Sequence, residues 1–212
     1  MYRNRYRLEA QAVRGDRAGC QVADHTDPRI IRTAQACRHA IVELASQRPV
    51  TQITVAELAD RAGITRATFY NHYGSPLELL IEVLMTDLEG AHQLEEERRG
   101  EGSYSAAQML RLTIADVADH IERFASLYQL ALHEAADGAV YEALVRHFVD
   151  YGLAFIARSD NPDLPNANHR VVAHFVAHGF AGAIKAWLGD DAVTKEDLID
   201  AAVACAPAWW SR

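Results

Sequence analysis

Four polar side chains between residues 65 and 73 have the types and the spacing that contact nucleic acid. On a helix, Arg66, Thr68, Tyr70 and Asn71 give an exposed face that can reach bases and phosphates. The fork of Arg66 suits the edge of guanine in the major groove, which makes it the best candidate for direct readout. The segment therefore predicts a helix that contacts DNA.

Residues that could support catalysis or metal binding form no recognised arrangement. The sequence has no GxSxG, Walker A, GxGxxG or HExxH motif. His174 and His178 have a spacing that can bind a metal, but no third ligand is evident in the same helix. The cysteines, Cys20, Cys37 and Cys205, form no CxxC pair. We therefore expect no enzyme, no metal site and no cofactor.

Two short helices joined by a tight turn would position the polar side chains. Thr54 and Glu57 have the spacing of a capping box that opens the first helix. Gly63, which can take a positive φ, ends that helix, and Thr65 caps the second. Phe69 is the bulky residue that the second helix would bury. This order of caps, stop and buried ring predicts a helix-turn-helix over 54–73.

Helical periodicity continues to the end of the chain, with no alternating pattern of a strand. Ser75 and Glu78 suggest a further capping box, with Pro76 at the first helical position of a long helix. This helix would end in the charged run 95–100, which we interpret as solvated. We expect an all-α fold of about nine helices, the others over about 28–46, 105–123, 125–134, 138–159, 168–188 and 194–207.

The stretch from Ile53 to Tyr73, with the sequence ITVAELADRAGITRATFYNHY, resembles the TetR family of bacterial regulators. The match in order and spacing extends from Arg29 to Leu84. The resemblance implies a DNA-binding head of three helices on an all-α body that binds a ligand and dimerises.

The implied domains have uneven charge. The head would cover 27–84 and the body 85–212, and residues 1–26 would be an arm that is either a disordered tail or a basic segment supporting DNA binding. The net charge is −8, yet residues 1–84 carry eleven Lys and Arg against nine Asp and Glu. An acidic body with a near-neutral head suits a protein that touches DNA with one end only.

Carried over by position, the resemblance implies individual DNA contacts. Thr65 and Arg66 would start the recognition helix and meet base edges or phosphates, and Thr54 would offer its hydroxyl and helix N-terminus to a phosphate. Backbone or groove contacts would come from the rest of the recognition helix, namely Thr68, Tyr70, Asn71, His72 and Tyr73.

One residue departs from the family pattern. The family usually has a lysine directly after the serine that opens the fourth helix, and that lysine contacts phosphate, whereas this chain has Pro76. Proline supplies neither a charge nor an amide donor. We therefore expect one fewer phosphate contact and a shallower salt dependence of DNA binding.

Two further sites are predicted in the body. An apolar pocket with a few polar groups would be lined by Tyr128, His133, Tyr141, His147, Phe148, Phe155, Phe175 and His178, unless these are ordinary core residues. The pattern G-x-x-G-x-x-x-x-W-L resembles one subfamily of these regulators. Its small residues would let two helices approach closely, either in a dimer or within one chain; they are Gly179, Gly182, Ala183 and Ala186, beside Trp187.

The expected function is that of a homodimeric regulator. We expect it in the cytoplasm, because no run of about 18 apolar residues could span a membrane and the N-terminus lacks a signal peptide. Its partners would be a palindromic double-stranded DNA operator and an unknown small-molecule effector. A ligand-responsive repressor is the leading interpretation. An activator of the same fold, or a helical ligand-binding or interaction module with a degenerate DNA head, are the alternatives.

Overall fold

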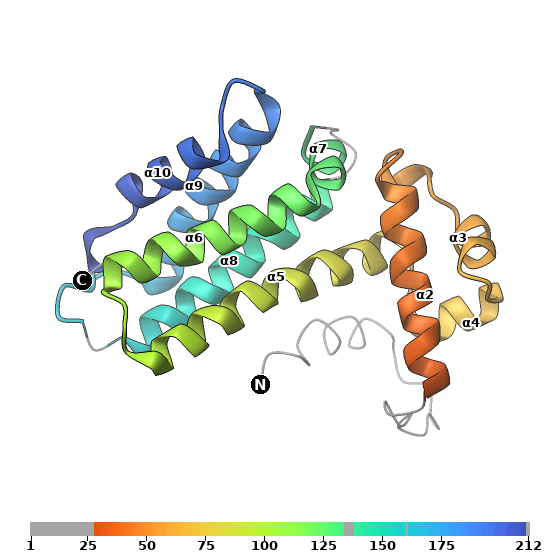
Figure 1. The fold of residues 1–212 in the computed structure, drawn as a ribbon, viewed down its shortest axis with the longest axis horizontal. Helices are drawn as coiled ribbons and strands as arrows, with labels where there is room; N and C mark the ends of the chain where they lie inside the picture. Colours follow the sequence, from red (N-terminus) through yellow and green to blue (C-terminus); the bar gives the residue numbers. More distant parts are fainter. Residues whose placement is uncertain (1–27, 134–137, 160, 211–212) are drawn as a thin grey trace.

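The computed structural model describes residues 28–133, 138–159 and 161–210. Within these ranges the chain forms nine α-helices and two short 3-10 helices, without a strand, which confirms the predicted all-α class. Helices α2, α3 and α4 form one end of the molecule, and the remaining helices form an elongated bundle (Figure 1). The predicted arm over 1–26 lies outside the described residues.

The first end of the molecule contains the predicted helix-turn-helix. Its elements are α2 (Pro28–Ala45), the 3-10 helix η1 (Val50–Gln52), α3 (Val55–Arg61) and α4 (Arg66–His72). Gly63 has a φ of +66° between α3 and α4, so the turn uses the left-handed backbone that glycine adopts without strain. The Phe69 ring is fully buried in the core beneath the two helices.

Thr54 caps α3, but the predicted capping box is only half formed. The Thr54 hydroxyl oxygen accepts a hydrogen bond from the Glu57 amide at 3.2 Å. The Glu57 carboxylate does not return to the Thr54 amide, and forms an ion pair with Arg48 instead. A tertiary partner has therefore replaced the local one, and it fastens α3 to the segment that follows α2.

The bundle is built on one long helix, α5 (Pro76–Glu101), which begins beside α2 and continues along α6 and α8 (Figure 1). The predicted border between residues 84 and 85 lies inside this continuous helix. The other elements are α6 (Ala106–Arg123), α7 (Ala125–His133), α8 (Gly138–Arg158), α9 (His169–Gly189), α10 (Lys195–Cys205) and the 3-10 helix η3 (Ala208–Trp210).

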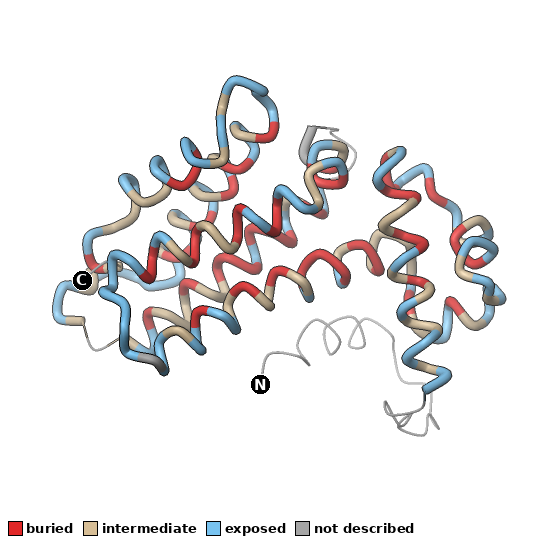
Figure 2. Tube along the Cα trace, in the orientation of Figure 1, coloured by how far each residue is buried: buried red, intermediate tan, exposed pale blue. Residues whose placement is uncertain are grey.

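Buried residues gather where α5, α6 and α8 run side by side (Figure 2). Helix α9 packs mainly on α8, through Ala173, Ala177, Ala181 and Ile184. In contrast, its opposite side leaves large apolar side chains in solvent. Phe175 is 82% exposed on that side.

Helix α9 is also the one helix in the described ranges with the length and composition of a membrane span. An 18-residue window in it has a mean hydropathy of 1.3, and 28% of that window is buried. Core helices of helical bundles have the same composition, so this property does not by itself indicate a membrane.

Candidate DNA-binding surface and ligand cavity

Helix α4 carries five of the residues that were predicted to contact DNA, and three of them are exposed. Arg66, Tyr70 and Asn71 are exposed, and Tyr70 has 53% of its surface in solvent. Thr68 and His72 are partly buried beside them. Arg66 and Tyr70 are four positions apart and therefore lie on the same face of α4.

The two threonines at the helix starts are exposed and already act as caps. The Thr65 hydroxyl oxygen accepts from the Thr68 amide at 3.1 Å, and it lies 2.9 Å from the Thr68 hydroxyl. Thr54 caps α3 in the same way. Because each cap uses a lone pair of the oxygen, the Thr54 hydroxyl proton stays available to a phosphate.

Tyr73 lies in the core, in contrast to the expected groove contact. It is 4% exposed, and its ring packs on Phe69 with 5.5 Å between the centroids. The residue follows the last turn of α4, where the chain bends inward toward α5. Its ring therefore supports the position of α4 instead of lying on the exposed surface.

Arg66 makes no ion pair with any residue in the described ranges, whereas the neighbouring Arg61 pairs with Glu43 of α2. A guanidinium at the first position of a capped helix, without a carboxylate partner, is available for a base or a phosphate. The Arg61 pair instead holds α3 against α2.

Pro76 occupies the first position of α5, as predicted from the sequence. The Ser75 hydroxyl accepts from the Glu78 amide at 3.1 Å, but the Glu78 carboxylate accepts from the Gly74 amide and not from Ser75. The second predicted capping box is therefore also half formed. It places a carboxylate at the helix end where the family usually has a cation.

The body contains a cavity of about 730 Å³ between α5, α6, α8, α9 and α10, which is partly open to solvent because its wall includes the exposed residues Phe175 and Gly179. This volume lies within the range of pockets for small organic ligands. Most of its wall is apolar and includes Met109, Leu110, Ile114, Val117, Phe148, Phe180 and Trp210.

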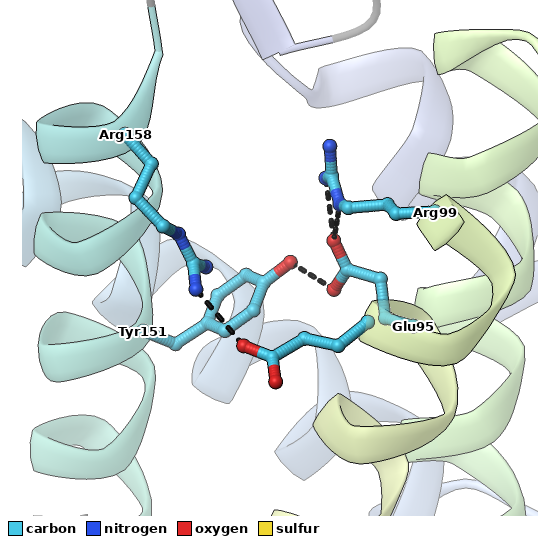
Figure 3. Close-up of polar contacts among 5 residues, drawn as sticks. Glu95, Arg99, Tyr151 and Arg158 are labelled. Carbon is cyan, nitrogen blue, oxygen red and sulfur yellow. Dashed lines mark hydrogen bonds and ion pairs between the residues drawn. The ribbon is translucent and has the colours of Figure 1, made fainter. Parts of the chain in front are cut away.

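A polar cluster forms one side of the cavity, around Glu95 (Figure 3). Glu95 is 2% exposed, and both its oxygens have partners: Arg99 donates to Oε1, with its Nε at 2.9 Å, and the Tyr151 hydroxyl donates to Oε2. Arg158 reaches in from α8 and pairs with Glu96 at 3.0 Å. Burial, the first cause, and the neighbouring carboxylate raise the pKa of Tyr151, so its proton stays on the phenol.

A pair of histidines extends the cluster. His92 stacks on Tyr151 with 4.1 Å between the ring centroids, and its Nε2 lies 2.8 Å from Nε2 of His147. Burial lowers the pKa of His92 to about 4 and that of His147 to about 3. Both rings are therefore neutral at pH 7, and a neutral imidazole can donate from one nitrogen and accept at the other.

Three of the residues predicted for the pocket line this cavity, namely Phe148, Phe155 and Phe175. The wall does not include Tyr128, Tyr141, His147 or His178, and the side chain of His133 lies outside the described part of the chain. Tyr128 is fully buried, with its hydroxyl 2.9 Å from Nε2 of His120, so it is a core residue.

The sequence-based reasoning missed the polar residues of the wall. The run 95–100 was expected to be solvated, yet Glu95 is among the most buried polar residues of the described chain. The signal lies in the spacing, because Leu88, His92, Glu95 and Arg99 continue one face of α5 at intervals of four, three and four residues. A charge on the buried face of a helix needs a buried partner, which the sequence does not reveal.

The residues predicted for a dimer interface lie on the outer side of α9. Gly179, Gly182 and Ala186 are exposed, and Ala183 and Trp187 are partly buried. Gly179 and Ala183 also belong to the cavity wall. His174 and His178 lie near these residues with 6.2 Å between their ring centroids, and the described residues contain no group of three side chains that could hold a metal ion.

The fold and the capped, exposed helix α4 define a helix-turn-helix protein. The sequence model of the family described as "Bacterial regulatory proteins, tetR family" matches residues 38–83. An uncharacterised HTH-type transcriptional regulator of Bacillus subtilis, YxbF, is 36% identical over 76 residues, which make up 35% of this chain and only 19% of that regulator. The family match lies in the helix-turn-helix end of the chain, and the comparisons together support a TetR-family regulator.

Solved structures extend the similarity in fold to the body. A protein described as a TetR-family transcriptional regulator from Syntrophomonas wolfei has a TM-score of 0.66 at 12% identity, over 82% of this chain and 92% of that one. FadR from Bacillus subtilis, solved in complex with stearoyl-CoA, has a TM-score of 0.55 at 15% identity, over 82% of this chain and 99% of that one. At these identities the likeness concerns the fold alone.

Proposed function

We propose that this chain is a ligand-responsive transcription repressor that binds a palindromic DNA operator as a homodimer in the bacterial cytoplasm. The observation that carries the proposal is the exposed face of α4, where Arg66 stands without an ion pair among the described residues and Tyr70 and Asn71 lie beside it. In this proposal residues 27–84 act as the DNA-binding head and residues 85–212 as the body.

Two copies of α4 would enter successive major grooves of the operator, about 34–36 Å apart. Arg66 would read a base, while the hydroxyls of Thr54, Thr65 and Thr68 would contact phosphates together with Tyr70, Asn71 and His72. Pro76 and the nearby Glu78 carboxylate would leave the start of α5 without a phosphate contact.

Selection from a pool of genomic fragments tests DNA binding, because the selection itself finds the operator. The wild-type chain should enrich palindromic sites, and Arg66→Ala should weaken binding to them by about 1–3 kcal/mol for each half-site. Arg146, an exposed arginine of α8, gives the matched control, since Arg146→Ala should leave binding unchanged. Equal DNA binding by the Arg66→Ala variant and the wild-type chain would support the alternative of a degenerate DNA head.

The outer side of α9 is the proposed dimer interface. Val171 and Phe175 are 67% and 82% exposed, and the glycines that follow on the same side leave the backbone open to close approach. A large apolar surface of this kind indicates an interaction site. We propose that α9 and α10 of two copies bury it.

Gly182→Arg tests this interface without disturbing the single chain, because a Cβ at Gly182 would meet nothing within 4 Å. Gly90→Arg on α5 is the matched control, since its Cβ would also meet nothing within 4 Å. Sedimentation should show a monomer for Gly182→Arg and a dimer for Gly90→Arg. A dimeric Gly182→Arg chain would refute this interface.

Ligand response is supported by the place of the cavity on α5. The helix carries His92, Glu95 and Arg99 at the cavity, and only three residues separate its start from the end of α4. A ligand that contacts this helix can change the separation of the two heads in the dimer. It does so only if it binds the arrangement that fits the operator and the arrangement that does not with different affinity. The FadR structure with stearoyl-CoA shows a bound ligand in a protein of similar fold, which supports an effector here.

A regulator of the same fold that activates transcription is the second candidate. A reporter in a deletion strain separates the two, because loss of a repressor raises expression of the target gene and loss of an activator lowers it.

A further inference from the structure

Two buried polar atoms at the cavity have no hydrogen-bond partner in the described part of the structure: the Thr113 hydroxyl oxygen and Nδ1 of His92. Both residues line the cavity, and Thr113 is only 7% exposed. A buried polar atom without a partner costs stability, so native structures nearly always pair such atoms. A polar atom of a ligand in this cavity would give both atoms a partner.

The two atoms come from neighbouring helices that share the cavity wall. His92 belongs to α5 and Thr113 to α6, and the two helices pack against each other along the bundle. The other buried polar group beside them is already paired, because Glu95 accepts from Arg99 at one oxygen and from Tyr151 at the other. A ligand would thus meet Thr113 and His92 as the open positions.

Charges around these positions favour an uncharged polar group. Each arginine of the wall is paired with a carboxylate, Arg99 with Glu95 and Arg158 with Glu96. Glu95 lies close enough to His92 to favour its protonated form, although burial outweighs this effect and lowers the pKa of His92 to about 4. A second carboxylate at Thr113 would meet a neutral imidazole and no unpaired arginine of the wall, which disfavours it.

We propose that the cavity binds a mainly apolar, uncharged molecule that carries a hydroxyl or carbonyl oxygen, and that Thr113 and His92 bind this oxygen. Met109, Ile114, Phe148 and Phe180 contact its apolar part. The proposal rests on the proposed function in so far as this molecule is the effector. It adds the chemical class of the ligand and the two side chains that recognise it.

The hydrogen-bonding capacity of the two residues fits either oxygen. A threonine hydroxyl both donates and accepts. His92 is neutral and uses Nε2 toward His147, so its Nδ1 donates or accepts according to which of the two rings holds the proton between them. Thr113 and His92 together can therefore satisfy an alcohol or a ketone.

Displacement of the uncharged fluorescent probe N-phenyl-1-naphthylamine by ten-carbon ligands tests the ligand class. Decan-1-ol, decan-2-one and decanoate share the chain length and differ in the polar group, and decanoate is ionised at pH 7.5. We expect the alcohol or the ketone to bind at least tenfold more tightly than decanoate. Equal or tighter binding of decanoate, or failure of the probe and the neutral ligands to bind, would overturn the proposal.

Thr113→Val tests the recognising side chain, because it removes the hydroxyl and keeps the shape. It should weaken the alcohol and the ketone by about three- to tenfold, the usual effect of one hydrogen bond, and leave decanoate unchanged. Thr86→Val, at an exposed position of α5, is the matched control. His92→Phe, which keeps a ring on Tyr151 but removes Nδ1, gives a second measurement if Thr113→Val does not fold. Unchanged affinities in both variants would contradict the assignment.

Operator release separates this proposal from the proposed function. If decan-1-ol binds with the expected selectivity but does not change DNA binding, the ligand class holds and the effector role fails. If the chain binds an operator but shows no preference for uncharged ligands, the regulator holds and the ligand class fails.

Discussion

The buried histidine pair should make the chain lose stability on acidification well above the range where carboxylates titrate. His92 and His147 have pKa values of about 4 and about 3 in the folded chain, against the ordinary value of 6.5. The main cause is burial in both cases. The charge of Glu95 partly opposes the shift in the pKa of His92, whereas His92 and His120 add to the shift in the pKa of His147.

The sign follows from proton binding. Between pH 6.5 and about 4 the unfolded chain protonates these histidines and the folded chain does not. Stability is therefore full above pH 6.5 and falls as the pH drops toward the folded values. Between pH 7 and 5 each histidine should lower the free energy of unfolding by about 2 kcal/mol, or about 4 kcal/mol for the pair. This loss is a large share of the roughly 5–15 kcal/mol of a typical domain.

Urea unfolding at pH 7, 6 and 5, followed by circular dichroism at one protein concentration, measures this loss. His92→Gln or His147→Gln should each remove about half of it, because glutamine does not titrate. His39, an exposed histidine of α2, provides the control, since His39→Gln should lose as much stability on acidification as the wild type. The comparison uses the change with pH, so a constant loss of packing in a variant does not affect it.

Two results would refute the reasoning. Equal stability of the wild-type chain at pH 7 and pH 5 would mean that the two histidines bind protons as readily in the folded chain as in the unfolded chain. An unchanged loss in both glutamine variants would assign the acid sensitivity to other groups.

Three further predictions concern the DNA-binding end. Phe69→Ala should lower the free energy of unfolding by about 3–5 kcal/mol in urea titrations, because the ring is fully buried. A smaller change would mean that neighbouring side chains move in to fill the space left by the ring. Pro76→Lys should steepen the slope of log Kd against the logarithm of the salt concentration by about 0.9 for each phosphate that the new lysine neutralises. An unchanged slope would mean that the start of α5 lies away from the DNA backbone. Gly63→Ala should cost about 1–2 kcal/mol in the same unfolding assay through its φ of +66°, whereas Gly90→Ala inside α5 should not destabilise the chain.

Helix ends and buried faces were predictable because they depend on neighbours in the chain. Thr54, Gly63, Thr65 and Asn168 end or begin helices where the sequence indicated, since caps and positive φ act within one turn. The class of fold and the exposed face of α4 followed from the same local periodicity.

Contacts between distant segments were not predictable from local patterns. The Glu57 carboxylate binds Arg48 instead of completing its capping box, and Tyr73 turns inward onto Phe69. For Glu57 a more distant neighbour replaces the local partner, and for Tyr73 the chain buries a ring that the sequence pattern left exposed. Similar competition explains why Tyr128 became a core residue bound to His120 and not part of a pocket.

Spacing along the chain was enough to predict the helices, the helix-turn-helix with Arg66 on its surface, and the resemblance to the TetR family. Only the tertiary structure decided that Glu95 is buried and that His92 meets His147 across 55 positions. It also decided that Thr113 faces a cavity with an unpaired hydroxyl. A cavity is the space left between helices, so its chemistry depends on which faces meet, and that depends on packing of the whole bundle.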